Sequence, residues 1–172
     1  MIIGVPKEIK PQETRIGLTP DSVKDLVSNG HEVLVENEGG HEAGFENSHY
    51  SYAGAKIVNK AEDIFDESEI IVKVKEPLLN EVKMIKENQI VFTYLHLAAA
   101  KDLTQGLINS KGVCIAYETV TDINGRLPLL APMSAVAGRM SVQAGAHCLE
   151  KNQKGRGLLL GGAPGVEGGT VV

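Results

Sequence analysis

The feature that most constrains the fold is the regular alternation of short apolar runs with segments of helical pattern. The apolar runs are rich in Val and Ile and occupy residues 2–5, 31–36, 55–58, 69–74, 89–94 and 113–118. Helical patterns lie between them at residues 19–30, 46–53, 60–68, 78–87 and 100–110. Apolar strands that alternate with helices are typical of a parallel sheet with helices on both faces. We therefore predict an α/β fold with a mostly parallel sheet.

The first helical segment carries signals at both of its ends. Thr19 can cap the helix, Pro20 suits its first turn and Gly30 can end it. Between them, Val23, Leu26 and Val27 share one face of the predicted helix. We expect this face to pack on the sheet.

Charge and composition exclude several classes of function. The net charge of −5 leaves no basic surface for nucleic acid. The two cysteines, Cys114 and Cys148, form neither a disulfide framework nor a metal-binding motif, and we expect them to be reduced. The apolar segment at the N-terminus is too short for a signal peptide, and no run reaches membrane-spanning length. We expect a cytoplasmic protein that does not bind membranes.

Two neighbouring strands of the predicted sheet are followed by titratable side chains. Lys75 ends the run "IIVKVK", and His96 follows the run "IVFTYL". In parallel sheets, ligands bind outside the carboxyl ends of the strands. A lysine at a strand end is usually exposed to water, and a histidine among apolar residues is usually structural. In a crevice, however, Lys75 can hold an anionic or carbonyl oxygen, and His96 can exchange a proton near neutral pH.

Arg15 lies in the polar loop "PQETRIGLTP" after the first strand. Loop arginines are usually solvated, but the planar guanidinium can also grip a carboxylate with two parallel hydrogen bonds. Together, Arg15, Lys75 and His96 predict a site for a small 2-oxo or 2-amino acid.

The last forty residues contain a helix and a glycine-rich segment. Residues 133–151 are predicted to be helical, with a row of small side chains at Ala137, Ser141, Ala144 and Cys148. Such a row suits either close packing against a neighbouring helix or subunit, or ordinary packing within the domain. The segment "GGAPGVEGG" lacks the spacing of a dinucleotide fingerprint, and a strand is expected to begin at Thr170.

Several motifs together resemble the amino-terminal part of alanine dehydrogenase. They are "IGVPKEIKPQETRIGLTP", "GHEVLVENEGG", "VKVKEP", "TYLHLA", "IAYETV" and "PLLAPMSAVAGRMSVQAGA", and the resemblance covers residues 1–169. It implies a Rossmann-like substrate domain at residues 1–130, and at residues 131–172 a linking helix and the start of an NAD-binding domain.

The resemblance also implies an oxidoreductase of amino-acid catabolism that uses NAD to interconvert L-alanine with pyruvate and ammonia. By that resemblance, His96 is the catalytic acid/base and Arg15 and Lys75 bind the substrate. Tyr94 and Met133 line the same region, and Ser134 contacts the nicotinamide cofactor. Such enzymes are homo-oligomers, commonly hexamers.

The resemblance leaves two alternatives open. In the family, the dinucleotide fingerprint follows the strand that begins at "TVV", so we expect this chain alone to be inactive. The first alternative is therefore a non-catalytic form that binds ligand or joins an oligomer. The second is the cofactor-binding subunit of an NAD(P) transhydrogenase, in which the pair of Lys75 and His96 has no explanation.

Overall fold

The computed structural model describes residues 1–171, which divide into two compact units. Unit 1 spans Met1–Val120, and unit 2 spans Thr121–Val172. The predicted assignment of residues 1–130 and 131–172 to a substrate domain and an NAD-binding domain stays a prediction. Among the described helices, none is long and apolar enough to cross a membrane.

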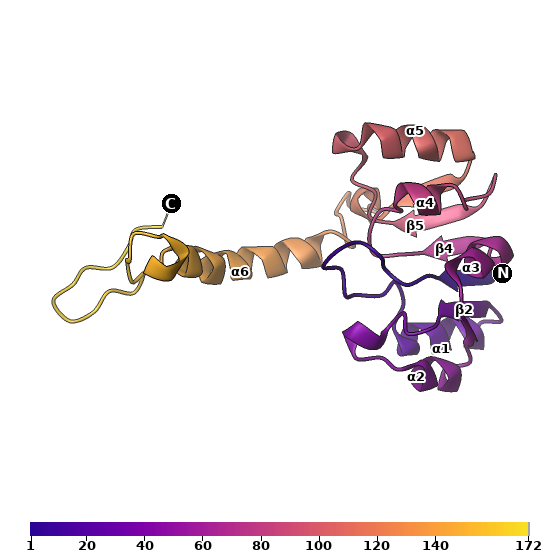
Figure 1. Ribbon diagram of the computed structural model, residues 1–172, viewed down its shortest axis with the longest axis horizontal. Coiled ribbons are helices and arrows are strands. Elements are labelled where there is room, and N and C mark those ends of the chain that lie inside the picture. The colour runs from indigo at the N-terminus through magenta and orange to yellow at the C-terminus, as the bar shows by residue number, and fades with distance from the viewer. Residues whose placement is uncertain (172) are drawn as a thin grey trace. The chain divides into compact units, whose positions relative to one another are not determined.

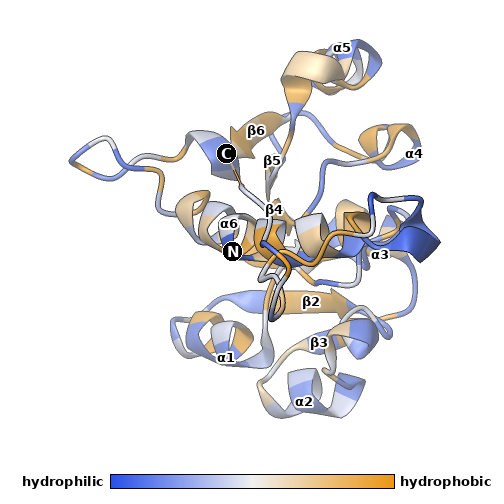
Figure 2. Cartoon of the chain, turned by 90° about the vertical axis from the view of Figure 1, so that its left-hand side faces the viewer, coloured by the Kyte–Doolittle hydropathy of each residue, from blue (hydrophilic) through white to orange (hydrophobic). Residues whose placement is uncertain are grey.

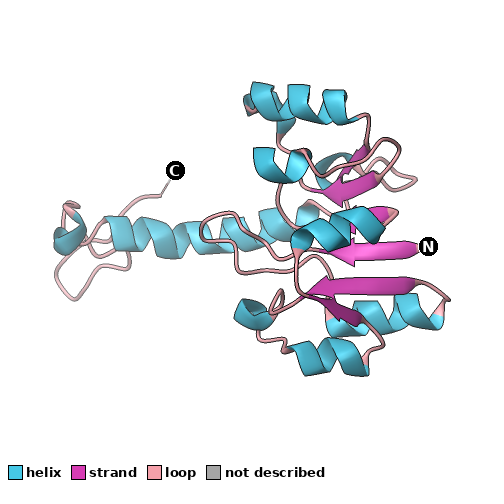
Figure 3. Cartoon of the chain, turned by 45° about the vertical axis from the view of Figure 1, so that its right-hand side comes forward, coloured by secondary structure: helices cyan, strands magenta, loops and turns pink. Residues whose placement is uncertain are grey.

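Unit 1 is built on one parallel six-stranded sheet, as the sequence pattern predicts (Figures 1 and 3). Its strands are β1 (Ile2–Val5), β2 (Glu32–Glu36), β3 (Lys56–Val58), β4 (Ile70–Val72), β5 (Ile90–Thr93) and β6 (Val113–Ala116). All five pairings between neighbouring strands are parallel. The α/β, Rossmann-like fold is thereby confirmed.

Five α-helices connect these strands. They are α1 (Pro20–Ser28), α2 (Asn47–Tyr52), α3 (Ala61–Glu67), α4 (Leu79–Val82) and α5 (Lys101–Ser110). Short 3-10 turns occupy η1 (His41–Ala43), η2 (Leu97–Ala99) and η3 (Tyr117–Thr119). The cap predicted for α1 is present, because the side chain of Thr19 accepts a hydrogen bond from the backbone N–H of Ser22.

The order of the strands places a switch point between β1 and β4. The sheet runs β3-β2-β1-β4-β5-β6, so the chain builds outward from β1 in one direction and then returns to β1 before building in the other. At such a point the connections leave the carboxyl ends of adjacent strands in opposite directions, and a crevice opens between them. The loop after β1 and the loop after β4 leave the sheet at this point.

The core of unit 1 consists of two apolar layers, one on each face of the sheet. Alternate residues of β2 belong to different layers: Leu34 packs with residues of α3, α4 and α5, whereas Val33 and Val35 pack with residues of α1 and α2. This alternation is the two-residue period of a strand. In Figure 2, the middle of β2 is hydrophobic, whereas α1 shows hydrophobic and hydrophilic residues. Burying one such aliphatic side chain stabilises the fold by roughly 1.5–3 kcal/mol.

One predicted helix is much shorter than expected. The pattern predicts a helix over residues 78–87, but α4 ends at Val82. Beyond it, Met84 and Ile85 form hydrogen bonds to the residues three positions earlier, and Asn88 has a φ of 66°. These tight turns place Ile85 in the core and direct the chain into β5, so the apolar spacing reflects turns and not a continuous helix.

Unit 2 contains the long helix α6 (Ala131–Cys148), the 3-10 turn η4 (Lys151–Gln153) and a glycine-rich segment. None of the residues of α6 is buried, so the packing partner of the predicted small-residue row stays a prediction. The strand expected from Thr170 is not formed at Thr170 or Val171, and Val172 lies outside the described residues.

Candidate functional site

Two of the predicted site residues occupy equivalent positions after adjacent strands. Lys75 lies three residues beyond the end of β4, and His96 lies three residues beyond the end of β5. Lys75 is half-buried and His96 is exposed. Both therefore emerge at the carboxyl edge of the sheet, beside the switch point between β1 and β4.

Arg15, in the loop after β1, is held by a neighbouring carboxylate. The side chain of Glu13 accepts hydrogen bonds from Nε of Arg15 at 2.8 Å and from Nη2 at 2.6 Å. The hydrogen bond with the Arg15 side chain lowers the pKa of Glu13 to about 2, against the opposing effect of burial, and the charge of Lys75 adds to the lowering. Arg15 and Lys75 therefore lie near the same carboxylate.

Tyr94 connects Arg15 to His96. The rings of Tyr94 and His96 stack with centroids 6.0 Å apart and an interplanar angle of 13°. The pKa of Arg15 is raised, first by its hydrogen bond with Glu13 and in part by the nearby Tyr94. The imidazole of His96 also affects Glu76. Burial works to raise the pKa of Glu76, but Lys10 and His96 outweigh this effect and lower the pKa.

These contacts bring Arg15, Lys75, Tyr94 and His96 to one end of the sheet in unit 1. Behind them lies a small aromatic cluster, in which Tyr117 meets Tyr94 edge to face at 5.0 Å and Phe92 at 4.3 Å. Tyr117 is half-buried, and this burial raises the pKa of its phenol. The cluster gives the exposed imidazole of His96 a packed support.

A hollow of about 540 Å³ borders His96. Its walls include Glu118 and the small side chains of Ala98, Ala99 and Ala116. The hollow is large enough for a small organic acid, but of the predicted site residues only His96 is among the described residues that line it.

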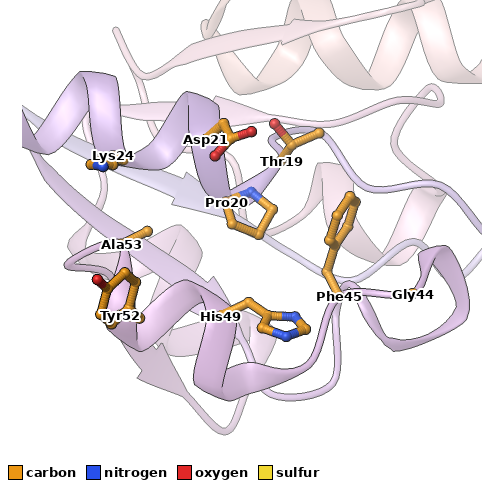
Figure 4. Close-up of a pocket in the computed structure, with 9 residues that line it drawn as sticks. All are labelled: Thr19, Pro20, Asp21, Lys24, Gly44, Phe45, His49, Tyr52 and Ala53. Carbon is orange, nitrogen blue, oxygen red and sulfur yellow. The ribbon is translucent and has the colours of Figure 1, made fainter.

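A second hollow, of about 500 Å³, lies between α1 and α2 (Figure 4). Asp21 and Lys24 of α1 line one side, and Phe45 and His49 line the side of α2. None of the predicted site residues is among the described residues that line it, so the chemistry predicted from the sequence is not located there.

The other two predicted site residues lie in unit 2. Met133 and Ser134 belong to the first turn of α6, where Ser134 is exposed and its hydroxyl lies 3.5 Å from the backbone oxygen of Leu130. Each keeps its role as a prediction, because that role depends on the resemblance alone.

Sequence reasoning missed the carboxylates that surround the site. Glu13 stands two residues before Arg15, a spacing that places both in one short loop, and this is the signal that could have found it. No sequence pattern indicates Glu8 and Glu118, because their carboxylates accept hydrogen bonds from backbone N–H groups that are far away in the sequence. Lysines near strand ends are usually exposed to water, but the side chain of Lys73 is only 1% exposed and lies between Glu8 and Glu81.

Comparison with known proteins gives a consistent assignment. The alanine dehydrogenase of Halomonas elongata is 54% identical over 96% of this chain and 45% of the relative. The alanine dehydrogenase of Geobacillus stearothermophilus is 53% identical over 99% of this chain and 46% of the relative. The chain therefore spans about half the length of the curated relatives it matches.

Solved structures agree with this result. A structure of L-alanine dehydrogenase matches with a TM-score of 0.88 and 54% identity, over 98% of this chain and 46% of that one. A transhydrogenase from Sinorhizobium meliloti matches less well, with a TM-score of 0.67 and 25% identity over 72% of this chain and 36% of that one. Residues 4–137 match the family described as alanine dehydrogenase/PNT, N-terminal domain, and the chain belongs to this family.

Proposed function

We propose that this chain supplies the substrate site of an NAD-dependent alanine dehydrogenase, which interconverts L-alanine with pyruvate and ammonia. One observation carries the proposal: the ring of His96 stacks on Tyr94, and Arg15 lies close enough to Tyr94 to interact with it electrostatically. Membership of the family and the relatives named alanine dehydrogenase support the same reaction.

The cations of the site suit a 2-oxo acid. In our proposal, Arg15 binds the substrate carboxylate, and Glu13 orients the guanidinium through its Nε and Nη2. Lys75 acts as a point charge that draws electron density toward the carbonyl oxygen. Because Glu13 already holds the Arg15 side chain before the substrate arrives, less entropy is lost when the reacting carbon is oriented.

His96 is the proposed acid/base. Its imidazole gives a proton to the carbonyl oxygen when pyruvate is aminated, and takes it from the carbinolamine hydroxyl in the reverse direction. Stacking on Tyr94 fixes the plane of the ring. An exposed edge leaves the ring accessible to substrate.

The proposed cofactor is NAD, whose nicotinamide supplies hydride transfer when it is bound. Ser134 is the residue of this chain that we assign to it. Its exposed hydroxyl can both donate and accept a hydrogen bond, which fits a carboxamide. We also propose a cytoplasmic homo-oligomer, a hexamer in the full-length protein.

The test uses a full-length protein that contains this chain. His96→Ala is expected to lower kcat by about 100-fold or more with a smaller change in KM, because general acid–base catalysis contributes about 10²–10⁴. His41→Ala is the matched control, because His41 is exposed, pairs with Glu46 and is none of the predicted site residues. Wild-type turnover in His96→Ala would remove the histidine from its proposed role.

A second candidate is a form that binds ligand without turnover. The isolated 172-residue chain should then bind pyruvate but reduce no NAD in the presence of alanine. Measurable turnover by the isolated chain eliminates this candidate.

A further inference from the structure

Two carboxylates from distant parts of unit 1 hold the backbone at the two proposed catalytic positions. Oε1 of Glu8 accepts the backbone N–H of Val74 at 2.6 Å and that of Lys75 at 3.3 Å. Oε1 of Glu118 accepts the backbone N–H of His96 at 2.8 Å and that of Leu95 at 3.1 Å. In both cases the donors belong to the proposed catalytic residue and to the residue before it.

We propose that Glu8 and Glu118 are positioning residues, which aim Lys75 and His96, respectively, by holding their backbone. The inference rests on the proposed function, because it assigns a purpose to the aim of these two side chains. Neither glutamate needs to touch the substrate.

The backbone of His96 shows why a carboxylate is needed there. Its φ of 49° and ψ of 38° lie in the left-handed region, which costs a residue with a side chain about 1 kcal/mol or more. Glu118 offsets this cost, since hydrogen bonds from N–H groups to an ionised oxygen are roughly twice as strong as neutral ones. A different φ at this position would rotate the imidazole away from its stack on Tyr94.

Glu118 accepts these hydrogen bonds as a carboxylate. Burial works to raise its pKa, but the backbone N–H groups of His96 and Leu95 and the nearby imidazole outweigh burial and lower the pKa. Glu118 is therefore ionised at neutral pH.

Glu8 is itself fixed by a buried network. Its Oε2 lies 3.3 Å from Nζ of Lys73, which also lies 2.8 Å from Oε1 of Glu81. The side chains of Glu8 and Lys73 are each 1% exposed, so the carboxylate cannot turn toward water. Its other oxygen is thus aimed at the backbone of residues 74 and 75.

The peptide group after Lys75 is held as well. The hydroxyl of Thr93, on the neighbouring strand β5, donates to the backbone oxygen of Lys75 at 2.9 Å. Lys75 is therefore fixed on its amide side by Glu8 and on its carbonyl side by Thr93. These two contacts fix the backbone from which the side chain of Lys75 extends, although β4 ends three residues earlier.

The first experiment measures kcat and KM for pyruvate in a full-length protein that contains this chain. Glu118→Ala is expected to lower kcat by about 100-fold, the cost of misplacing a reacting group by about 1 Å, with KM changed by less than about threefold. Glu118→Gln keeps an oxygen that accepts the same N–H groups, so it should recover at least about tenfold of that loss. Glu87→Ala, which removes a carboxylate that is 60% exposed, is the control and should behave as wild type.

The outcomes separate this proposal from the proposed function. If His96→Ala abolishes turnover while Glu118→Ala keeps the wild-type kcat, the positioning role is overturned and the function stands. Equal losses in Glu118→Ala and Glu118→Gln also overturn it, because an oxygen that can accept the same N–H groups then restores none of the turnover. If the wild-type protein does not oxidise alanine, the proposed function itself fails. A crystal structure of Glu118→Ala gives an independent readout: a φ of His96 that stays near 49° contradicts the role assigned to Glu118.

For Lys75 we choose Thr93→Val beside Glu8→Gln, because removing the charge of Glu8 can impair folding through its buried partner Lys73. Thr93→Val keeps the shape of the side chain and removes only the donor to Lys75. It should raise KM for pyruvate about tenfold with less effect on kcat. An unchanged KM in folded Thr93→Val and in folded Glu8→Gln refutes the hold on Lys75.

Discussion

Lys73→Met is expected to destabilise the chain strongly, although this lysine has no role in the proposed chemistry. Methionine has a similar length and is unbranched, so the change removes the ammonium and little of the packing. It leaves the carboxylates of Glu8 and Glu81 buried side by side, at 1% and 3% exposure, without the cation that lies between them.

The size of this destabilisation depends on whether the ion pair is exposed or buried. Exposed ion pairs contribute about 0–1 kcal/mol, because water screens them. Removing one partner of a buried pair costs about 3–5 kcal/mol, because an uncompensated charge remains in a poorly solvated place. Lys73 is 1% exposed and belongs to the second class, so we expect a loss of about 3–5 kcal/mol in the free energy of unfolding. For a chain of this size that corresponds to a fall in Tm of roughly 6–20 °C.

Urea denaturation is the assay. With a slope of about 2 kcal/mol/M, the unfolding midpoint should fall by roughly 1.5–2.5 M. Lys56→Met is the matched control: the pair of Lys56 and Glu67 spans 3.5 Å at 59% and 47% exposure, so its midpoint should change little. If Lys73→Met lies within about 1 kcal/mol of the wild type, like the control, then the buried network does not stabilise the fold as argued.

The remaining predictions concern three other contacts. The pKa of Glu13 is lowered from 4.5 to about 2, so the stability from its pair with Arg15 is present above pH 4.5 and lost as the pH falls toward 2; Glu13→Gln should flatten that part of the stability curve. Burial raises the pKa of Tyr50 from 10.0 to about 12, so its contribution is present below pH 10 and lost as the pH rises through about 12. Tyr50→Phe should abolish that loss in alkaline unfolding curves but cost about 1 kcal/mol at neutral pH, through the hydrogen bond of its hydroxyl. Gly17→Ala places a Cβ 2.6 Å from the carbonyl oxygen of Val72, so urea curves should show a loss of about 1–3 kcal/mol and KM for pyruvate should rise as the Arg15 loop moves.

The sequence predicts the layers of unit 1 well because both faces of the sheet are buried. Continuous apolar runs with helices between them fit few other folds, and each of the six predicted strands is present. The order β3-β2-β1-β4 does not follow from the pattern, because each pairing joins segments that are far apart in the chain. The helix predicted at residues 78–87 was wrong beyond Val82, because apolar spacing alone does not separate a helix from successive turns.

The site was predictable only in part, and the two lysines of "KVK" show why. Lys73 and Lys75 stand on either side of Val74 and have the same parity along the chain. One side chain is 1% exposed between two carboxylates, and the other lies half-buried beside Glu13. The carboxylates that make this difference come from residues 8 and 81, so the distinction lies in the tertiary structure and not in the local pattern.

The geometry of the strand ends explains why such distant carboxylates are present at all. A strand fixes its backbone through hydrogen bonds to its neighbours, and these bonds position side chains well only as far as the strand extends. Lys75 and His96 both start three residues beyond that limit, where a side chain can reach over the edge of the sheet toward a ligand. Their backbone N–H groups then need other acceptors, and an ionised oxygen that accepts two of them restores the lost constraint. The end of a parallel sheet can therefore be both open to substrate and rigid, provided that carboxylates accept the hydrogen bonds that a neighbouring strand would otherwise accept.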